Sequence, residues 1–271
     1  MDARSNNVRC NYRFDFDMDA THEDSLRIEL EAQSADIVFA AGPRFDGTTD
    51  VQSLLLEDPH HKLIKVRKVV FDKPIVIIYN PHSGKMQNLV PLIEKRLSSE
   101  KIEYELMCTK KAGDTYLFPY EMDLDKYSML VACGGDGSYH EVVNGMLARK
   151  DGKKLPIGML PNGSGNDTCS AIGVITLDHA LDYIVSGYVT PYDTIRCLMD
   201  VDEHKLPEDY ESYKTHVRHM LINCSLSMPA LIANEAIKYK TCCGKLCYTV
   251  ATLEQAALGN IKQHHFSVTL D

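Results

Sequence analysis

The chain of 271 residues has room for one large domain or two of ordinary size, which excludes a peptide hormone or a disulfide-stabilised miniprotein. Hydrophobic residues make up 44% and charged residues 25%, values typical of folded globular proteins rather than of disordered or fibrous ones. The formal net charge of -9 argues against a domain that binds nucleic acid through a basic surface, so we expect no nucleic-acid partner.

Targeting signals are not found in the sequence. The first residues lack the apolar core of a signal peptide, and no later stretch reaches the roughly 20 apolar residues that a membrane span needs. The nine cysteines are an odd number and mostly scattered, which favours reduced thiols over a disulfide framework. We therefore expect a cytoplasmic protein.

The region 1–72 is the least informative part, and the sequence leaves its role open. Acidic clusters alternate there with short apolar runs. Its last part, HHKLIKVRKVVF, partly alternates between apolar and basic residues, which favours a half-exposed strand over a basic stripe that contacts a membrane.

The region 73–200 has the alternation of apolar strands and amphipathic helices that is typical of an α/β domain with a parallel sheet. We predict helices that carry Leu89 to Leu97, Val142 to Leu147 and Leu177 to Val185, the last ending at Gly187. The predicted strands are 75–79, 103–109, 128–133 and 155–160.

The stretch 201–216 is charged and interrupts this pattern, so we predict a connection or a surface insertion. In the region 217–271 we predict a second, β-rich domain, with strands at 216–227 and 264–271 around a helix from about Tyr248 to Leu258.

Three loops of small residues follow three of the predicted strands. They are NPHSGK (80–85), GGDGS (134–138) and PNGSGND (161–167). The carboxyl ends of parallel strands line one edge of a sheet, where ligands bind, and glycines let several backbone N–H groups approach one anion. The loops match neither the P-loop nor the GxGxxG dinucleotide motif. Together they predict a phosphate site of another kind, with a nucleotide as its ligand.

Two acidic residues stand at the second loop. Asp136 could hold Mg²⁺ or accept a proton from an attacking hydroxyl, which are two tasks of phosphoryl transfer, or it could cap the following helix. Glu141 could orient a substrate or a metal-bound water, or it could simply suit the helix dipole. Both alternatives stay open for each residue.

The three loops resemble those of the lipid kinase family that includes diacylglycerol, sphingosine and ceramide kinases. NPHSGK is similar to the first nucleotide loop of the family, GGDGSYHEVVNG to its hallmark loop and helix, and LPNGSGND to its third loop. The HEVVNG segment after GDG is most similar to the sphingoid-base kinases. The resemblance covers 73–200 clearly and continues weakly from about 220.

The resemblance implies a Rossmann-like nucleotide domain followed by a β-sandwich domain, and transfer of the ATP γ-phosphoryl group to a lipid hydroxyl with Mg²⁺ as cofactor. It implies a membrane lipid, most of all a sphingoid base, as substrate, with diacylglycerol or ceramide as alternatives, and a peripheral association with membranes. Asp136 would be the general base or the metal ligand. The nucleotide contacts would be Asn80, Pro81, His82, Ser83, Gly84, Thr109, Gly134, Gly135, Asp136, Gly137, Ser138, Glu141, Gly163, Ser164 and Asn166.

Three positions depart from the family pattern in the last region. Asn234 stands where an acidic substrate contact is expected, and Thr241 and Cys247 stand where arginines often assist the phosphates. A second hypothesis is therefore a nucleotide-binding regulatory protein without catalysis. The chain also ends where relatives continue with further strands, so we expect an incomplete sandwich domain. A zinc site at the CCGKLC segment is disfavoured by the adjacent placement of its first two cysteines.

Overall fold

The computed structural model describes residues 12–17, 25–39, 67–81, 89–199, 216–222, 228–260 and 265–270. The chain divides into two compact units. One is formed by Ser34–Thr194, and the other combines Met1–Gln33 with Ile195–Asp271.

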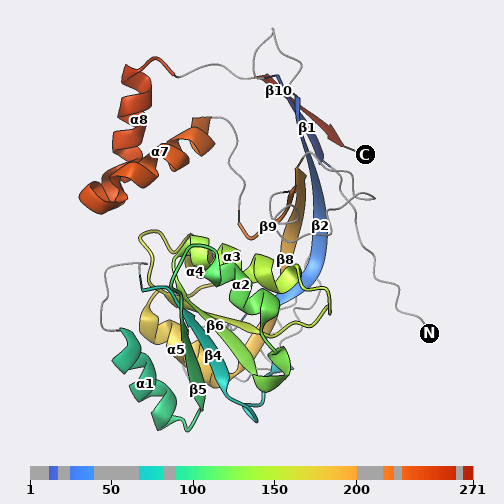
Figure 1. The fold of residues 1–271 in the computed structure, drawn as a ribbon, viewed down its shortest axis with the longest axis vertical. Helices are drawn as coiled ribbons and strands as arrows, with labels where there is room; N and C mark the ends of the chain where they lie inside the picture. Colours follow the sequence, from blue (N-terminus) through green and yellow to red (C-terminus); the bar gives the residue numbers. More distant parts are fainter. Residues whose placement is uncertain are drawn as a thin grey trace, which may run out of the picture. The chain divides into compact units, whose positions relative to one another are not determined.

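A four-stranded parallel sheet forms the centre of the first unit (Figure 1). Its strands are β4 (Ile75–Tyr79), β5 (Tyr104–Cys108), β6 (Met129–Gly134) and β7 (Ile157–Pro161), in the spatial order β7-β6-β4-β5. All three strand pairs are parallel. At the β7 side, Phe39 at the end of β2 (Ser25–Phe39) adds one parallel pairing with Ile157. The predicted α/β class with a parallel sheet is confirmed.

Burial explains why these strands are continuous apolar runs. The first four residues of β4 are at most 1% exposed, and all six residues of β6 are buried. Strands covered on both faces have no need for alternating polar residues.

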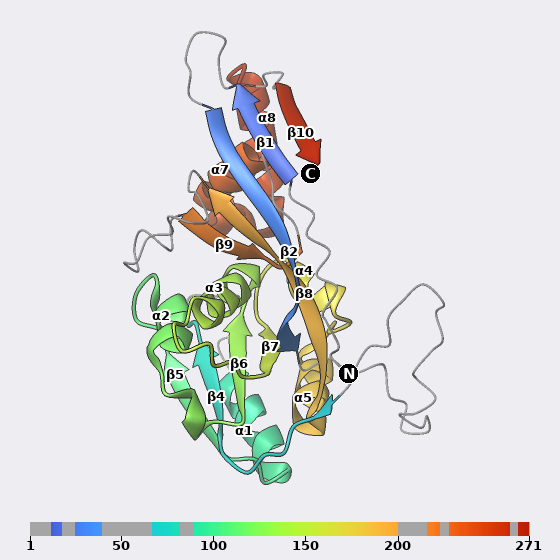
Figure 2. The same cartoon turned by 90° about the vertical axis from the view of Figure 1, so that its right-hand side faces the viewer.

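Helices cover both faces of this sheet. They are α1 (Leu89–Ser99), α2 (Asp114–Glu121), α3 (Asp136–Leu147), the short α4 (Asp167–Ala171) and α5 (Leu177–Ser186), with a 3₁₀ turn, η2, at Leu124–Lys126. Along the chain, β5 lies on one side of β4, whereas β6 and β7 lie on the other side. Connections between parallel strands are right-handed, so this change of direction places α1 on one face of the sheet and α2 and α3 on the other. Figure 2 shows this division, with α5 on the α1 side.

Helices α1, α3 and α5 lie where the periodicity predicts them, and Gly187 ends α5 with a left-handed φ of 70°. Helices α2 and α4 were not predicted. Helix α2 contains Pro119 and lacks a one-sided apolar stripe, because Asp114 and Thr115 are buried along with Tyr116. Helix α4 has only five residues, too few for a periodic pattern.

Helices α2 and α3 are held together by close backbone packing and by one arginine. A Cβ atom on Gly145 of α3 would lie 2.2 Å from the carbonyl oxygen of Tyr116 in α2, so only glycine fits there. Arg149, just after α3, donates from Nη1 to the carbonyl oxygens of Pro119, Tyr120 and Met122 at 2.8–3.0 Å. These carbonyls close the end of α2, where the helix offers them no partner.

The described part of the second unit contains antiparallel strands and two helices. Strand β1 (Tyr12–Asp17) pairs with β2 on one side and with β10 (His265–Leu270) on the other, and β9 (Val217–Met220) pairs with β8 (Tyr188–Met199). In the first unit, the short strand β3 (Arg67–Lys68) pairs with the beginning of β8.

Over its described residues, the region 217–271 is more helical than predicted. Helix α7 (Met228–Cys243) follows β9, then a 3₁₀ turn, η4 (Gly244–Leu246), and helix α8 (Cys247–Ala257). Helix α8 and strand β10 agree with the prediction, and α7 was missed. Strand β9 covers part of the strand expected over 216–227, of which 223–227 lie outside the described residues. The apolar residues of α7 are spread around the helix, which hides its periodicity, and Ala236 packs with Cys247 and Ala251 of α8 as the core of this helix pair. Most of the predicted connection 201–216 lies outside the described residues.

Among the described residues, no helix combines the length and the apolar character that crossing a membrane requires.

Candidate nucleotide-binding site

The four parallel strands end side by side, and a row of backbone hydrogen bonds continues past their ends. The Thr109 N–H donates to the Tyr79 carbonyl oxygen at 2.9 Å, the Asn80 N–H to Cys133 at 3.2 Å, and the Asn162 N–H to Gly134 at 2.7 Å. The segments after β5, β4, β6 and β7 therefore leave the sheet as neighbours at its carboxyl edge. This is the edge where ligands bind in open α/β sheets.

The GGDGS loop passes directly into α3. Gly135 precedes the helix in an extended conformation, and Asp136 and Gly137 are the first two helical residues. The N–H groups of a first helical turn lie at the positive end of the helix dipole, where they favour an anion. In α3 the Ser138 N–H already donates to the Gly135 carbonyl oxygen at 2.9 Å. A Cβ atom added to Gly137 would meet no other atom within 4 Å, so the backbone is open to approach at this point.

Asp136 does not cap α3, in contrast to one reading of the sequence. The residue before the helix is Gly135, and the Asp136 carboxylate reaches across to the next loop instead. Its Oδ1 atom accepts a 2.8 Å hydrogen bond from the N–H of Thr168, at the beginning of α4. One carboxylate oxygen therefore joins the second loop to the third and fixes the orientation of the carboxyl group.

The second and third loops are in backbone contact. A Cβ atom on Gly163 would lie 2.5 Å from the Gly135 Cα atom, a distance that no side chain tolerates. Asn166 has a left-handed φ of 59°, and its side-chain amide makes two hydrogen bonds to the backbone of Gly163, at 2.8 and 3.0 Å. Asn166 therefore shapes the third loop from within.

A buried tyrosine fastens the ends of β6 and β7. The Tyr139 hydroxyl lies 2.8 Å from the carbonyl oxygens of both Gly134 and Leu160, and its side chain is 1% exposed. Burial is the main reason why the pKa of this phenol is raised well above its ordinary value. Tyr139 therefore stays neutral and serves to hold the two strand ends at a fixed separation.

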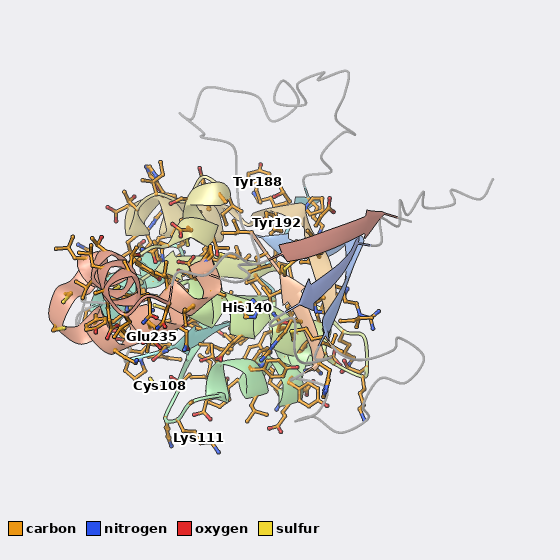
Figure 3. All side chains as sticks on the ribbon, turned by 90° about the horizontal axis from the view of Figure 1, so that it is seen from above. Cys108, Lys111, His140, Tyr188, Tyr192 and Glu235 are labelled. Atoms are coloured by element: carbon orange, nitrogen blue, oxygen red, sulfur yellow. The ribbon has the colours of Figure 1, made fainter. Side chains whose placement is uncertain are left out.

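Asp114 organises the segment after β5. Its Oδ2 atom accepts hydrogen bonds from the N–H groups of Lys110 and Lys111, at 2.8 and 3.0 Å. The backbone hydrogen bond from Lys110 is the largest cause that lowers the pKa of Asp114, so the carboxylate is charged at neutral pH. The loop that starts at the buried Thr109 is thus tied back to the first turn of α2. Figure 3 labels Cys108 and Lys111, which bracket this segment.

The structure brings most of the predicted site residues to this one edge. Asn80 and Pro81 follow β4, Thr109 follows β5, the Gly134 to Ser138 loop joins β6 to α3, and the Gly163 to Asn166 loop joins β7 to α4. Glu141 lies in α3, one turn beyond the loop. His82, Ser83 and Gly84 lie outside the described residues.

His140, labelled in Figure 3, follows the hallmark loop in α3. Its backbone carbonyl accepts from the Asn144 side chain at 2.8 Å, and its ring Nδ1 atom lies 3.4 Å from the same amide nitrogen. These polar contacts are therefore local to α3.

Three residues that sequence reasoning missed contribute to this edge: Asp114, Tyr139 and Thr168. Thr168 contributes a backbone N–H, for which a sequence holds no signal. For Asp114 the sequence holds a weak signal. It is an acidic residue just after Gly113 and shortly after a strand end, which is a common arrangement at the start of a helix.

The departures from the family pattern lie in the α7–α8 helix pair. Asn234 is exposed on α7, and Cys247 is 1% exposed in the core between the two helices, where a small apolar residue suits the packing. Within the described ranges, no cluster of three or more histidine, cysteine, aspartate or glutamate side chains is arranged to hold a metal ion.

The donor set at the loop edge fits a magnesium nucleotide better than a metal bound by protein alone. Mg²⁺ binds through one or two carboxylates together with substrate phosphates and keeps several waters. Asp136 offers one oriented carboxylate with Oδ1 held by Thr168, and the open backbone at Gly137 leaves room for phosphate oxygens. The residues present therefore fit ATP with Mg²⁺.

Comparison with known families gives a match over the same part of the chain. Residues 74–197 match the family model described as diacylglycerol kinase catalytic domain, which includes every loop discussed above. The resemblance to lipid kinases is thus confirmed for this segment.

Among characterised relatives, the chain is 31% identical over 127 residues to sphingosine kinase B of Dictyostelium discoideum, a match that covers 45% of this chain and 17% of that protein. It is 38% identical over 120 residues to a diacylglycerol kinase of Staphylococcus aureus, covering 43% of this chain and 38% of the relative. The chain thus matches well under half the length of either relative. A crystal structure of a diacylglycerol kinase from Bacillus anthracis aligns with a TM-score of 0.37 and 23% identity, over 42% of this chain and 39% of that one.

Proposed function

We propose, from the premise that residues 74–197 form a diacylglycerol kinase catalytic domain, that this protein is an ATP-dependent lipid kinase. The observation that carries the proposal is the hydrogen bond between Asp136 and the Thr168 N–H, which joins two glycine loops at the edge where all four parallel strands end. Such an edge, with open backbone amides and one oriented carboxylate, suits a polyphosphate.

In the proposed reaction, the hydroxyl oxygen of the lipid attacks the γ-phosphorus of ATP. The bond between the γ-phosphorus and the bridging oxygen breaks, and ADP leaves with that oxygen. The hydroxyl proton passes to the Asp136 carboxylate, which acts as general base. Because Thr168 holds Oδ1, the Oδ2 atom is the natural acceptor of the proton.

The backbone amides at the start of α3 and in the third loop would hold the phosphates. Bound Mg²⁺ would neutralise charge on the phosphates, and Asp136 would be its protein ligand in the alternative to the general-base role. The remaining nucleotide contacts are those predicted from the sequence, from Asn80 to Asn166, and Glu141 would orient the acceptor or a metal-bound water.

As acceptor we propose a sphingoid base, with diacylglycerol and ceramide as alternatives. The proposal is supported by the HEVVNG segment of α3, which resembles the sphingoid-base kinases. Since such acceptors reside in a bilayer, the protein would work in the cytoplasm and associate with membranes peripherally.

The test is transfer of label from γ-labelled ATP to lipid, with Mg²⁺ and vesicles that contain sphingosine, ceramide or diacylglycerol. We expect product from the wild type and a decrease of about 10²- to 10⁴-fold in Asp136→Asn, the range typical of a lost general base. The amide can still accept the Thr168 hydrogen bond, so this variant should fold. Asp178→Asn is the matched control, because it removes an exposed first-turn carboxylate from α5 and should leave the rate unchanged.

The lipid that becomes labelled identifies the acceptor. Equal rates in wild type and Asp136→Asn would contradict the role of Asp136, and labelling of diacylglycerol or ceramide alone would contradict the sphingoid base.

A second candidate, a nucleotide-binding regulatory protein without catalysis, is supported by the position of Cys247. This residue stands where an arginine often assists the phosphates in the family, yet its side chain is buried in the core of the α7–α8 pair. ATP binding by calorimetry, without product from any of the three lipids, would favour this candidate.

A further inference from the structure

Two adjacent cysteines face each other at the end of α7. The Sγ atoms of Cys242 and Cys243 lie 3.3 Å apart, within the range of a hydrogen bond between two thiols. Helix α7 ends at Cys243, and Gly244 follows with a left-handed φ of 53°. The pair is therefore placed at a bend between α7 and η4 rather than inside a continuous helix.

The surroundings of this pair differ from those of the buried cysteines. Cys242 is exposed and Cys243 is half-buried, so both can be reached from the solvent. Cys133 and Cys169 are buried in the first unit, and burial raises the pKa of each of these thiols to about 12. Because the thiolate is the reactive form, these two thiols are inert at neutral pH.

We propose that Cys242 and Cys243 form a reversible oxidation site, at which hydrogen peroxide joins the two sulfur atoms in a disulfide. The site is independent of phosphoryl transfer and goes beyond the proposed function. The observation behind it is the juxtaposition of two accessible thiols on neighbouring residues.

The reaction proceeds in two balanced steps. The Cys242 sulfur, as the more exposed of the two, attacks peroxide, the O–O bond breaks, and a sulfenic acid and one water are formed. The Cys243 sulfur then attacks the Cys242 sulfur, the S–O bond breaks, and a second water leaves with the remaining thiol proton. The two sulfur atoms lose two electrons in total, which peroxide gains.

The geometry of neighbouring residues makes this bond easy to reduce. Adjacent Cα atoms across a trans peptide are about 3.8 Å apart, whereas disulfides usually join Cα atoms about 4.4–6.8 Å apart. A disulfide between neighbours is therefore strained, and strained or exposed disulfides have the higher reduction potentials of labile, regulatory bonds. We expect the bond to form under peroxide and to be reversed by small thiols.

The sequence allows a direct test, because trypsin cleaves after Lys240 and Lys245 and separates the pair from Cys247. The full chain is treated with peroxide, remaining thiols are alkylated, and the digest is analysed by mass spectrometry. We expect an unalkylated peptide 241–245 that is two hydrogen atoms lighter than its reduced form. Dithiothreitol should restore alkylation at both cysteines. In the reduced protein, phenylarsine oxide, which bridges close thiols, should protect both from alkylation.

Cys242→Ser and Cys243→Ser should each abolish the light peptide and the protection by phenylarsine oxide. Cys108 is the matched control, because it is an exposed cysteine without a cysteine neighbour in sequence. Its peptide should show alkylation or stepwise oxygen addition, without the loss of two hydrogens.

Three outcomes would overturn the proposal: peptide 241–245 linked to the peptide that contains Cys247, the same peptide linked to another chain, or both thiols still alkylated when Cys108 is already oxidised. The tryptic peptides of the oxidised wild type alone distinguish these outcomes, so the test does not depend on the folding of the serine variants.

Discussion

At the carboxyl edge of the sheet, single contacts determine which residues the loops of the candidate site can accommodate. Gly163 and Gly135 come so close that a Cβ atom on Gly163 would lie 2.5 Å from the Gly135 Cα atom, whereas a Cβ atom on Gly137 would meet nothing within 4 Å. Glycine is therefore needed at positions 163 and 137 for different physical reasons. Gly163 is needed for the packing of two loops, and Gly137 leaves open space beside the first turn of α3.

Substitution by alanine should separate these two reasons. We expect Gly163→Ala to destabilise the protein by about 1–3 kcal/mol, because the backbone of one loop must move, and to weaken ATP binding as well. We expect Gly137→Ala to leave the melting temperature unchanged or slightly higher, since alanine favours a helix, and to weaken ATP binding alone. Thermal unfolding and calorimetric titration with ATP and Mg²⁺ provide the two measurements. Unchanged ATP affinity in Gly137→Ala would show that phosphates do not approach this turn.

At the scale of elements, α2 and α3 behave as one packed pair on the sheet. Gly145 lets the two backbones touch, and Arg149 donates from Nη1 to three carbonyl oxygens at and after the end of α2. Arg149 also pairs through Nη2 with Asp151 at 2.6 Å. Because α2 begins at Asp114 and α3 at Asp136, the pairing of these helices also fixes the two loops that precede them.

Removal of the Arg149 guanidinium should loosen this pair. We expect Arg149→Met to destabilise the protein by about 1.5–3 kcal/mol, the range for hydrogen bonds to charged groups, because its side chain is only 8% exposed. Arg96→Met is the control, since Arg96 makes ion pairs with Glu100 and Asp182 at the surface, where such pairs contribute about 1 kcal/mol or less. Urea unfolding of both variants measures the difference, and equal losses would contradict the role of Arg149.

The pH dependence of the free energy of unfolding provides a second test of Arg149→Met. The hydrogen bond from Arg149 is the largest cause that lowers the pKa of Asp151, from 3.8 to about 2. A carboxylate with a lowered pKa stabilises the folded state above its ordinary pKa, and this contribution disappears as the pH falls toward the lowered value. Between pH 4 and pH 2, the wild type should therefore lose this contribution in urea unfolding, whereas Arg149→Met should lose less, because it keeps only the smaller part that comes from Lys153.

At the scale of the whole molecule, the candidate site is assembled within one compact unit, Ser34–Thr194, from loops that are up to about eighty residues apart in sequence. The unit carries a second feature, a shallow hollow lined by Pro74, Ser98 and residues 101–105. This hollow lies at the amino ends of β4 and β5, on the edge opposite the glycine loops. The open backbone at Gly137 and the oriented Asp136 carboxylate lie at the loop edge instead.

Hydrogen exchange with and without a non-hydrolysable ATP analogue and Mg²⁺ should decide between the two edges. We expect slower exchange in 109–114, 134–141 and 162–168, because a bound nucleotide would cover these loops and restrain the local opening that exchange requires. Residues 101–105 serve as the internal control and should not change. Protection at 101–105 without protection at the loops would place the nucleotide at the wrong edge for the proposed function.

The sequence by itself determined the parallel sheet, three of its helices and the three loops that follow strands, because buried strands and amphipathic helices leave periodic patterns and loops of glycine interrupt them. The same three loops also indicated the lipid kinase family. The sequence could not predict α7, whose apolar residues do not form one stripe, or α2, which contains a proline.

Only the tertiary structure decided what Asp136 contacts. Its partner is a backbone N–H of a residue 32 positions away, and every residue except proline carries such a group, so no sequence pattern marks it. The same holds for the contact between Gly163 and Gly135 and for the Tyr139 hydroxyl between two strand ends. These contacts depend on the order of strands in the sheet, which is a property of the folded chain.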